Sequence, residues 1–207
     1  MPSPRALVIE TATAACSVAL IENDAVIARA HEVVGRGHAE RLVPMIAELP
    51  DQGRAGRILV DCGPGSFTGI RVGLAAAIGL GIGWGAEVTG FSSLALIAAM
   101  GFADRPGRDA LAVVMEGGHG EVFMQAFAHP LAAIDVLASR RPDAARAALG
   151  GLPAIGNGVR HLAALDPALD LVEALPEAAR VVLLPPAWTA LPARPIYGRA
   201  PDAVPNP

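Results

Sequence analysis

Short runs of apolar and β-branched residues alternate with turn residues at the start of the chain. The runs are Leu7 to Glu10, Ala15 to Glu22 and Ala25 to Val34, and the turn-like Glu22-Asn23-Asp24 joins the last two. This pattern predicts an antiparallel meander of three strands. Apolar residues then recur every three or four positions between His38 and Leu49, which predicts an amphipathic helix.

The next segment reads as a strand, a glycine loop and a helix, an order typical of α/β proteins. Arg57 to Cys62 is a short apolar strand, and Ile70 to Trp84 has the pattern of a helix. We expect a further strand at Glu87 to Phe91, followed by a helix over Leu94 to Met100 with Ser92 as its N-cap.

The second half of the chain predicts a separate lobe. Gly101 to Asp109 is rich in glycine, proline and charge, and therefore predicts a linker. Beyond it the pattern predicts a hairpin of strands 110–116 and 121–128, a helix over 143–149, a strand over 153–156 and a tail that wraps the surface from Pro185. We expect an N-terminal lobe of residues 1–100 and a C-terminal lobe of residues 101–207.

Composition excludes several chemistries. The chain is 53% hydrophobic with a formal net charge of −4, and its 16 basic residues are all arginine. Without lysine, neither a P-loop lysine nor a Schiff base is possible. The arginines are scattered, with Arg140 and Arg141 as their one adjacent pair, so strong direct binding of tRNA or DNA is not expected.

Localisation signals in the sequence favour the cytoplasm. Cys16 and Cys62 lie in apolar runs outside any CxxC or CxxH pattern, which predicts buried free thiols in a reducing compartment. The N-terminus lacks the apolar core of a signal peptide. The longest apolar window, residues 72–86, contains glycines and is shorter than the roughly 18 to 20 residues that span a bilayer. We therefore expect a soluble cytoplasmic protein with no membrane contact.

The segment DCGPGSFTGIRVG, from Asp61 to Gly73, contains the glycine loop. The loop consists of Gly63, Pro64, Gly65, Ser66, Phe67, Thr68 and Gly69. It fails as a Walker loop because Ile70 follows its last glycine in place of lysine. It fails as a dinucleotide fingerprint and as a nucleophile elbow because Thr68 stands where each pattern needs glycine. Three interpretations stay open: a backbone anion site, a nucleophile at Ser66 with an unidentified base, or a helix start capped by the hydroxyls of Ser66 and Thr68.

The helix after this loop carries four interior glycines, Gly73, Gly79, Gly81 and Gly83. Each costs roughly 0.8 to 1 kcal/mol relative to alanine in a helix interior, so a gain in packing must offset them. Small residues at four-residue spacing allow another backbone to approach closely. The neighbour is either the protein's own sheet alone, or the sheet and a second helix.

Seven stretches, taken together, resemble the TsaB family, whose members are bacterial partners in making threonylcarbamoyladenosine in tRNA. The resemblance is strong over residues 7–98 and patchy but in order up to Arg199, and GPGSFTGIRVG is its most specific string. The stretches are LVIETATAACSVAL (7–20), GHAERLVPMI (37–46), DCGPGSFTGIRVGL (61–74), GFSSLALIA (90–98), EVFMQAF (121–127), GNG (156–158) and PIYGR (195–199).

The resemblance implies an actin-like, sugar-kinase-like (ASKHA) α/β fold of two lobes, the first opening with the meander. It also implies a non-catalytic paralogue of TsaD, the subunit that transfers the threonylcarbamoyl group to the adenosine next to the anticodon. The implied partners are a TsaD-like subunit, a TsaE-like ATPase subunit and, for the isolated chain, a second copy; tRNA is contacted only through the complex. The implied TsaD surface comprises Leu42, Met45, Ile46, Leu49, Arg71, Leu74, Ala75, Ile78 and Ile82.

No cofactor, metal or catalytic residue is expected. TsaD holds a metal with an H-x-x-x-H pair, and the matching positions here are His38 and Leu42, whereas a metal normally needs at least three protein ligands. The chain also has Glu10-Thr11 where the family has Asp-Thr, and Glu116-Gly117-Gly118 where the family commonly has Asp-Ala-Arg. The alternatives are an ATP-binding actin-like module and a serine hydrolase or peptidase that uses Ser66.

Overall fold

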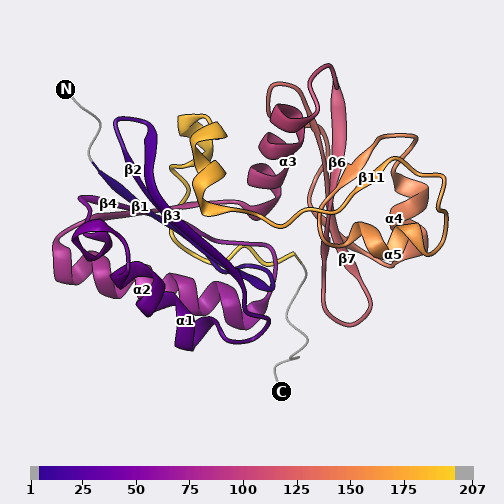
Figure 1. Ribbon diagram of the computed structural model, residues 1–207. Coiled ribbons are helices and arrows are strands. Elements are labelled where there is room, and N and C mark those ends of the chain that lie inside the picture. Colours follow the sequence, from indigo (N-terminus) through magenta and orange to yellow (C-terminus); the bar gives the residue numbers. More distant parts are fainter. Residues whose placement is uncertain (1–4, 199–207) are drawn as a thin grey trace, which may run out of the picture.

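Two mixed β-sheets with helices packed on them form the two lobes of the protein (Figure 1). The computed structural model describes residues 5–198. The first sheet has the strand order β3-β2-β1-β4-β5. Its strands are β1 (Ala6–Glu10), β2 (Ala15–Glu22), β3 (Ala25–Val33), β4 (Arg57–Asp61) and β5 (Glu87–Phe91).

The predicted meander is confirmed. Strands β1, β2 and β3 are antiparallel neighbours, and β4 and β5 continue the sheet in parallel. Because side chains alternate along a strand, Leu7 and Ile9 pack under the helices on one face, and Ala6 and Val8 face the core between the lobes. Burial on both faces explains why β1 reads as an unbroken apolar run.

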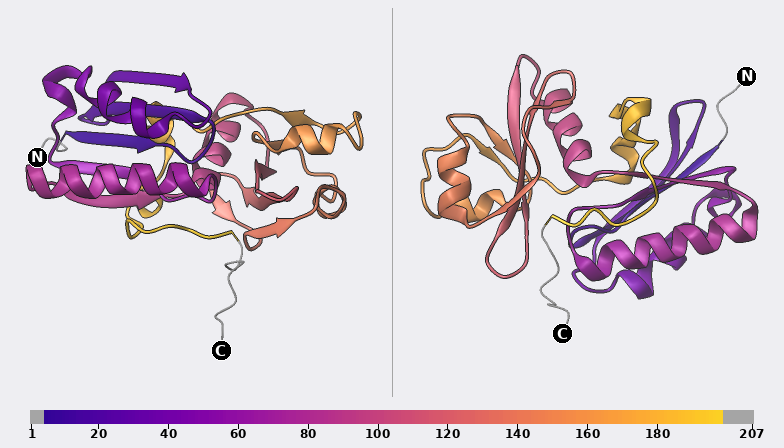
Figure 2. Two further views of the ribbon diagram at one scale, coloured as in Figure 1. Left: turned by 90° about the horizontal axis from the view of Figure 1, so that it is seen from below. Right: turned by 180° about the vertical axis from the view of Figure 1, so that it is seen from behind.

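Helices α1 and α2 lie side by side on the outer face of this sheet (Figure 2). Their bounds are His38–Ala47 for α1 and Phe67–Trp84 for α2, and a short 3₁₀ segment, η1 (Pro50–Gly53), follows α1.

The amphipathic pattern of the first helix is confirmed, but its apolar stripe faces the sheet and not the solvent. An apolar stripe on a helix that covers a sheet is the side that the helix buries. Five residues expected on the TsaD surface are therefore core residues of this lobe: Leu42, Met45, Ile46, Leu49 and Leu74.

The second sheet has the strand order β11-β10-β6-β7-β8, with β9 paired to β7 off that path. Helices α4 and α5 cover its outer face (Figure 1). The predicted hairpin is confirmed as β6 and β7, whereas the short strands β8, β9 and β11 and the helix α5 were not predicted. The elements are β6 (Ala110–Glu116), β7 (Val122–Ala128), β8 (Ala132–Ala133), β9 (Ala138–Arg140), α4 (Pro142–Ala148), β10 (Ala154–Ile155), α5 (Val159–Ala163) and β11 (Leu171–Val172).

Helix α3 (Ser93–Asp104) lies between the two sheets (Figure 1). It packs in one core with side chains from both lobes, among them Val8 of β1 and Val113 of β6. A helix that is covered on several sides is apolar all round, as this one is. The helix continues to Asp104, so residues 101–104 are helical and the linker predicted from Gly101 begins later.

After the second sheet the chain returns to the first lobe. The 3₁₀ segment η2 (Ala178–Leu183) packs against β1, β2, β3 and α3, and η3 (Pro186–Trp188) follows it. Leu191 then forms a β-bridge with Gly90 at the edge of the first sheet. Part of the segment 178–198, which the sequence places with the C-terminal lobe, thus contacts the first lobe.

Some glycines of α2 are closely packed against the turn after β1, and others face open space. A Cβ atom added at Gly69 would lie 2.0 Å from Thr11 O, and one added at Gly73 would lie 2.4 Å from Thr11 Oγ1. These two glycines allow the helix to pack against the turn after β1. A Cβ atom added at Gly79 or Gly83 would meet nothing within 4 Å, so these two leave an open strip on the outer face.

This contrast predicts opposite effects of the same substitution. Gly79→Ala is expected to raise the free energy of unfolding by about 1 kcal/mol, because alanine favours a helix and the site is open. Gly69→Ala is expected to lower it by about 1 to 3 kcal/mol, because the new methyl group collides with backbone. Urea denaturation of the two variants tests the contrast, and equal shifts would contradict the packing described here.

Candidate functional site

A cleft with a volume of about 720 Å³ opens between the lobes. Residues 12–14 of the β1–β2 turn and the glycine loop line it from the first lobe. Glu116, Phe123 and Asn157 line it from the second lobe, and residues 195–198 of the C-terminal segment close one side. Segments of both lobes thus line one cavity.

The glycine loop is held against the β1–β2 turn by short backbone contacts. The N–H of Ser66 donates to Ala12 O at 2.7 Å, and the hydroxyl of Thr11 donates to Gly69 O at 2.8 Å. The N–H of Gly69 donates to Ser66 Oγ at 3.2 Å, which confirms Ser66 as the N-cap of α2. Thr68, expected to share the capping, lies in the first turn of the helix with its side chain exposed.

Within residues 5–198, no hydrogen bond joins the Ser66 side chain to a histidine or a carboxylate. Its Oγ takes part in the capping bond from Gly69 alone. His38 Nε2 lies 3.0 Å from Ala15 O, and His161 Nε2 lies 3.2 Å from Glu116 Oε1, so the bonds of these two imidazoles go elsewhere. The arrangement supports a structural hydroxyl at position 66, and His119 is a histidine that lines the same cleft.

His38 and Leu42, which match the metal-binding positions of TsaD, are both buried. His38, the first residue of α1, is buried and its ring bonds the backbone of β2, while Leu42 packs into the core. Within residues 5–198, no group of three or more His, Cys, Asp and Glu side chains is arranged to hold a metal ion. His38 therefore fixes the start of α1 on the sheet.

An arginine and two aromatic rings stand at the mouth of the cleft. The guanidinium of Arg71 lies 3.5 Å from the centre of the Phe67 ring, and its NH2 group donates to the Tyr197 hydroxyl at 3.4 Å. The Phe67 and Tyr197 rings are 6.4 Å apart. Gly198 lies against Phe123, so the C-terminal segment joins the two walls. Arg199 of the PIYGR stretch lies outside the described residues.

Two carboxyl groups at the base of the glycine loop were not predicted as site residues. Glu10 and Asp61 are fully buried at the ends of β1 and β4. Burial, followed by the charge of Asp61, raises the pKa of Glu10 well above its usual value, and burial raises the pKa of Asp61 to about 7. A charged residue that ends an apolar strand was the signal for both.

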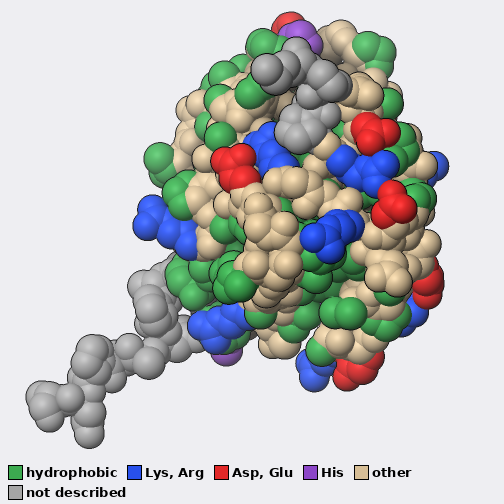
Figure 3. Space-filling view, turned by 90° about the vertical axis from the view of Figure 1, so that its left-hand side faces the viewer, with side chains coloured by type: hydrophobic (Ala, Val, Ile, Leu, Met, Phe, Trp, Pro, Cys, Tyr) green, Lys and Arg blue, Asp and Glu red, His purple; other side chains and the backbone are tan. Residues whose placement is uncertain are grey.

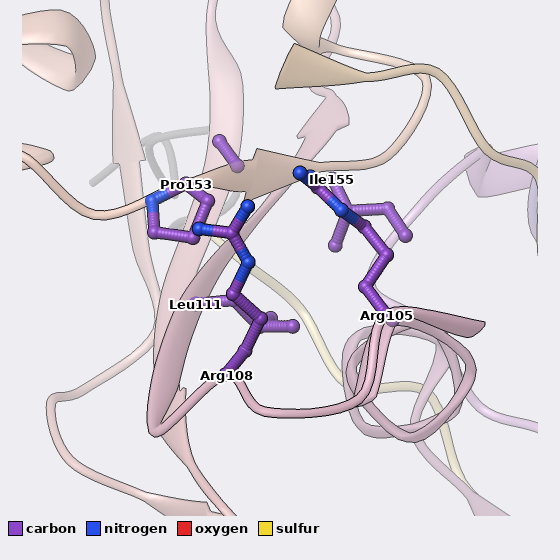
Figure 4. A pocket seen from close by; sticks show the side chains of 7 residues that line it. Arg105, Arg108, Leu111, Pro153 and Ile155 are labelled. Atoms are coloured by element: carbon purple, nitrogen blue, oxygen red, sulfur yellow. The ribbon is translucent and has the colours of Figure 1, made fainter. Parts of the chain in front are cut away.

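A second, much smaller pocket of about 10 Å³ lies at the far end of α3, between Arg105, Arg108 and the strand β10 (Figure 4). Both arginines bind Asp170: Arg105 donates to its two oxygens at 2.9 and 3.1 Å, and Arg108 donates at 2.8 Å. The bonds from Arg105 lower the pKa of Asp170. The ion pairs occupy these arginines, and the space between them is too small for a ligand.

The outer side of α1 and α2 carries apolar residues. Val43, Ile78 and Ile82 are exposed, and Ile82 is 81% exposed. Arg71 and Ala75, which were expected on the partner surface, also face outward. By length and composition alone, the 18 residues of α2 would suffice to cross a membrane, and one third of them are buried in the protein. The expectation that the segment is too short is therefore not met by α2.

Two α/β lobes around a cleft, with the chain entering through an antiparallel meander, define the actin-like, sugar-kinase-like class of proteins. A crystal structure of a Pseudomonas aeruginosa protein, described as similar to the peptidase YeaZ, has this fold: the TM-score is 0.80 and the sequence identity 25%, over 95% of this chain and 100% of that chain. The ASKHA fold implied by the sequence is confirmed.

The sequence comparisons then identify the family. The family described as "TsaD: tRNA N6-adenosine threonylcarbamoyltransferase" matches residues 28–166. The Escherichia coli "tRNA threonylcarbamoyladenosine biosynthesis protein TsaB" is 36% identical over 126 residues, which cover 58% of this chain and 53% of that protein. An uncharacterized protein of Mycobacterium tuberculosis is 30% identical over 96% of this chain and 93% of its own length. The chain belongs to the TsaB family, and the match spans about half the length of the Escherichia coli relative.

The capping role of Ser66 predicts a defined loss of stability. Ser66→Ala is expected to lower the free energy of unfolding by about 1 kcal/mol, because the N–H of Gly69 loses its acceptor. Thr68→Ala, two residues further on, is the matched control and is expected to cause no loss. Urea denaturation compares the two, and an equal loss in both variants would contradict the assignment of the cap.

Proposed function

We propose that this protein is a non-catalytic subunit of the complex that makes threonylcarbamoyladenosine in tRNA, and that it binds and stabilises a TsaD-like transferase subunit in the cytoplasm. The observation that carries the proposal is the exposed face of α1 and α2. We call this surface the docking face; it comprises Val43, Arg71, Ala75, Ile78, Gly79, Ile82 and Gly83.

The chemistry of the docking face suits a protein partner. Three exposed branched apolar side chains, Val43, Ile78 and Ile82, lie on two adjacent helices. Gly79 and Gly83 leave open space beside them, so a partner helix has room to approach the backbone of α2. Exposed apolar side chains on neighbouring helices are typical of interaction sites. The same face is assigned to a second copy of the chain when the transferase is absent.

The absence of catalysis is supported by the groups around Ser66. Its hydroxyl caps α2, and none of the described hydrogen bonds joins it to a histidine or carboxylate. The Escherichia coli relative is named for threonylcarbamoyladenosine biosynthesis. We assign the bond-forming step to the TsaD-like partner, and the supply of ATP hydrolysis to a TsaE-like subunit.

Contact with tRNA is assigned to the complex and not to this chain alone. The net charge is −4, and on the face shown in Figure 3 arginine side chains alternate with acidic ones in place of a continuous basic field. Binding of phosphates by one protein needs clustered positive charge. The basic surface that tRNA needs is therefore expected on the partner.

A charge on the docking face is expected to break the association. Ile82→Glu should weaken binding to the TsaD-like subunit at least tenfold, because an exposed branched side chain that becomes buried contributes about 1.5 to 3 kcal/mol. Ile82 replaces Leu74 as the residue to test, since Leu74 is buried and a charge there would disturb the fold.

Val136→Glu is the matched control, because Val136 is 80% exposed on the second lobe, away from the docking face. Calorimetric titration with the TsaD-like subunit gives the affinities, and light scattering of each variant alone gives the mass. Equal affinities of Ile82→Glu and Val136→Glu would contradict the proposed surface.

A reconstituted threonylcarbamoylation reaction, followed by mass spectrometry of the tRNA, tests the function itself. Product should disappear when this protein is omitted and persist with Ser66→Ala. Product that forms equally well without the protein would contradict the proposed role. Product that is lost with Ser66→Ala, at a temperature where the variant is folded, would instead favour a nucleophile at Ser66.

A further inference from the structure

Two carboxyl groups are buried next to each other where the lobes meet. Strands β1 and β4 are parallel neighbours in register up to Ile9 and Val60, and Glu10 and Asp61 are the next residue of each. Equivalent residues on parallel neighbours point to the same face, on strands about 4.8 Å apart. This face is the inner one, toward α3, and both side chains are 0% exposed.

Each carboxyl group has one oxygen with donors and one without. Glu10 Oε1 accepts from the N–H of Ala12 at 2.6 Å, and Asp61 Oδ1 accepts from the N–H of Gly63 and the hydroxyl of Ser93, both at 2.7 Å. Glu10 Oε2 and Asp61 Oδ2 are buried without any hydrogen-bond partner. An ionised carboxylate only accepts, so two ionised groups would leave two buried acceptors unsatisfied.

No positive charge compensates the pair. Among residues 5–198, no arginine or histidine forms an ion pair or hydrogen bond with either carboxyl group. The nearest thiols, Cys16 and Cys62, are neutral, because burial raises their pKa to about 11 and about 12. On the packed elements α3 and η2, the charged residues Asp104 and Arg180 bind each other.

We propose that Glu10 and Asp61 share one proton in the folded protein, which makes the lobe junction sensitive to pH. One proton held by the pair removes one of the two buried negative charges and turns one of the unsatisfied acceptor oxygens into a hydroxyl. Two adjacent carboxyl groups in an apolar site hold a proton in this way because both cannot ionise at little cost. Burial raises the pKa of both groups, which is the direction that a retained proton requires.

The position of the pair gives the proton a structural role. Asp61 joins the glycine loop, through Gly63, to the start of α3, through Ser93. Glu10 holds the β1–β2 turn, through Ala12, on which the glycine loop rests. When the proton leaves, like charges repel at the point where these three segments meet. The wall of the cleft then loosens as the pH rises.

The sign of the pH dependence follows from the protons bound. In the unfolded chain both groups lose their protons near pH 4, whereas the folded pair keeps one up to neutral pH. From about pH 5 upward, the folded state therefore holds more protons, and its stability falls as the pH rises. One extra proton corresponds to an unfolding constant that increases up to about tenfold per pH unit.

Glu10→Gln replaces one carboxyl group of the pair by a neutral amide of nearly the same shape, so the like charges and the shared proton are both removed. Urea denaturation between pH 5.5 and pH 8 is measured for the unaltered protein, for Glu10→Gln and for Glu40→Gln, whose carboxyl group is exposed on α1. The histidines are common to all three. In the unaltered protein and in Glu40→Gln, we expect the unfolding constant to increase up to about tenfold per pH unit. In Glu10→Gln this increase should be lost.

Parallel pH profiles for the unaltered protein and Glu10→Gln would overturn the proposal. Infrared spectroscopy of the unaltered protein at pH 7 decides the matter if the variant does not fold. A carbonyl band of a protonated carboxyl group, resistant to rapid exchange with D₂O, is the expected result. Absence of such a band at pH 7 would overturn the proposal as well.

Discussion

The fold depends on one close backbone contact, between the glycine loop and the β1–β2 turn. A Cβ atom at Gly65 would lie 2.1 Å from Ala12 O, and one at Gly69 would lie 2.0 Å from Thr11 O. Only glycine tolerates such an approach. The contact sets where α2 begins, and α2 in turn determines which residues of the first lobe face the cleft and which face outward. The glycines of the string GPGSFTG are thus required for packing, whether or not the loop binds a ligand.

The sequence predicted the elements of the first lobe well, because its strands and helices have regular periods. It did not show which apolar residues of a helix are buried within the chain, and α1 illustrates the reason. A helix on a sheet has one apolar stripe, and periodicity locates the stripe without saying what covers it. Leu42 and Met45 mark that stripe, and the protein's own sheet covers it. Val43 is the one large hydrophobic residue of α1 that is exposed, and the helical period of the apolar residues does not indicate it.

Contacts between distant segments were beyond prediction from one sequence. The return of η2 to the first lobe depends on contacts such as the N–H of Ala178 donating to Ser17 Oγ, between residues 161 positions apart. The carboxyl pair is of the same kind: Glu10 and Asp61 each end an apolar strand, and only the parallel pairing of β1 with β4 makes them neighbours. Local patterns specify elements, whereas sites arise where elements meet.

The interior glycines of α2 differ in whether the chain itself packs against them. Gly73 and Gly81 pack against Thr11 and Val88, so the chain itself provides a reason for them. Gly79 and Gly83 pack against nothing, and together they cost roughly 2 kcal/mol of helix stability that no contact within the chain offsets. The same side of the helix exposes Ile82. A surface that lowers the stability of the isolated chain and exposes apolar side chains supports the proposed docking face, because close approach of a partner backbone would recover the cost.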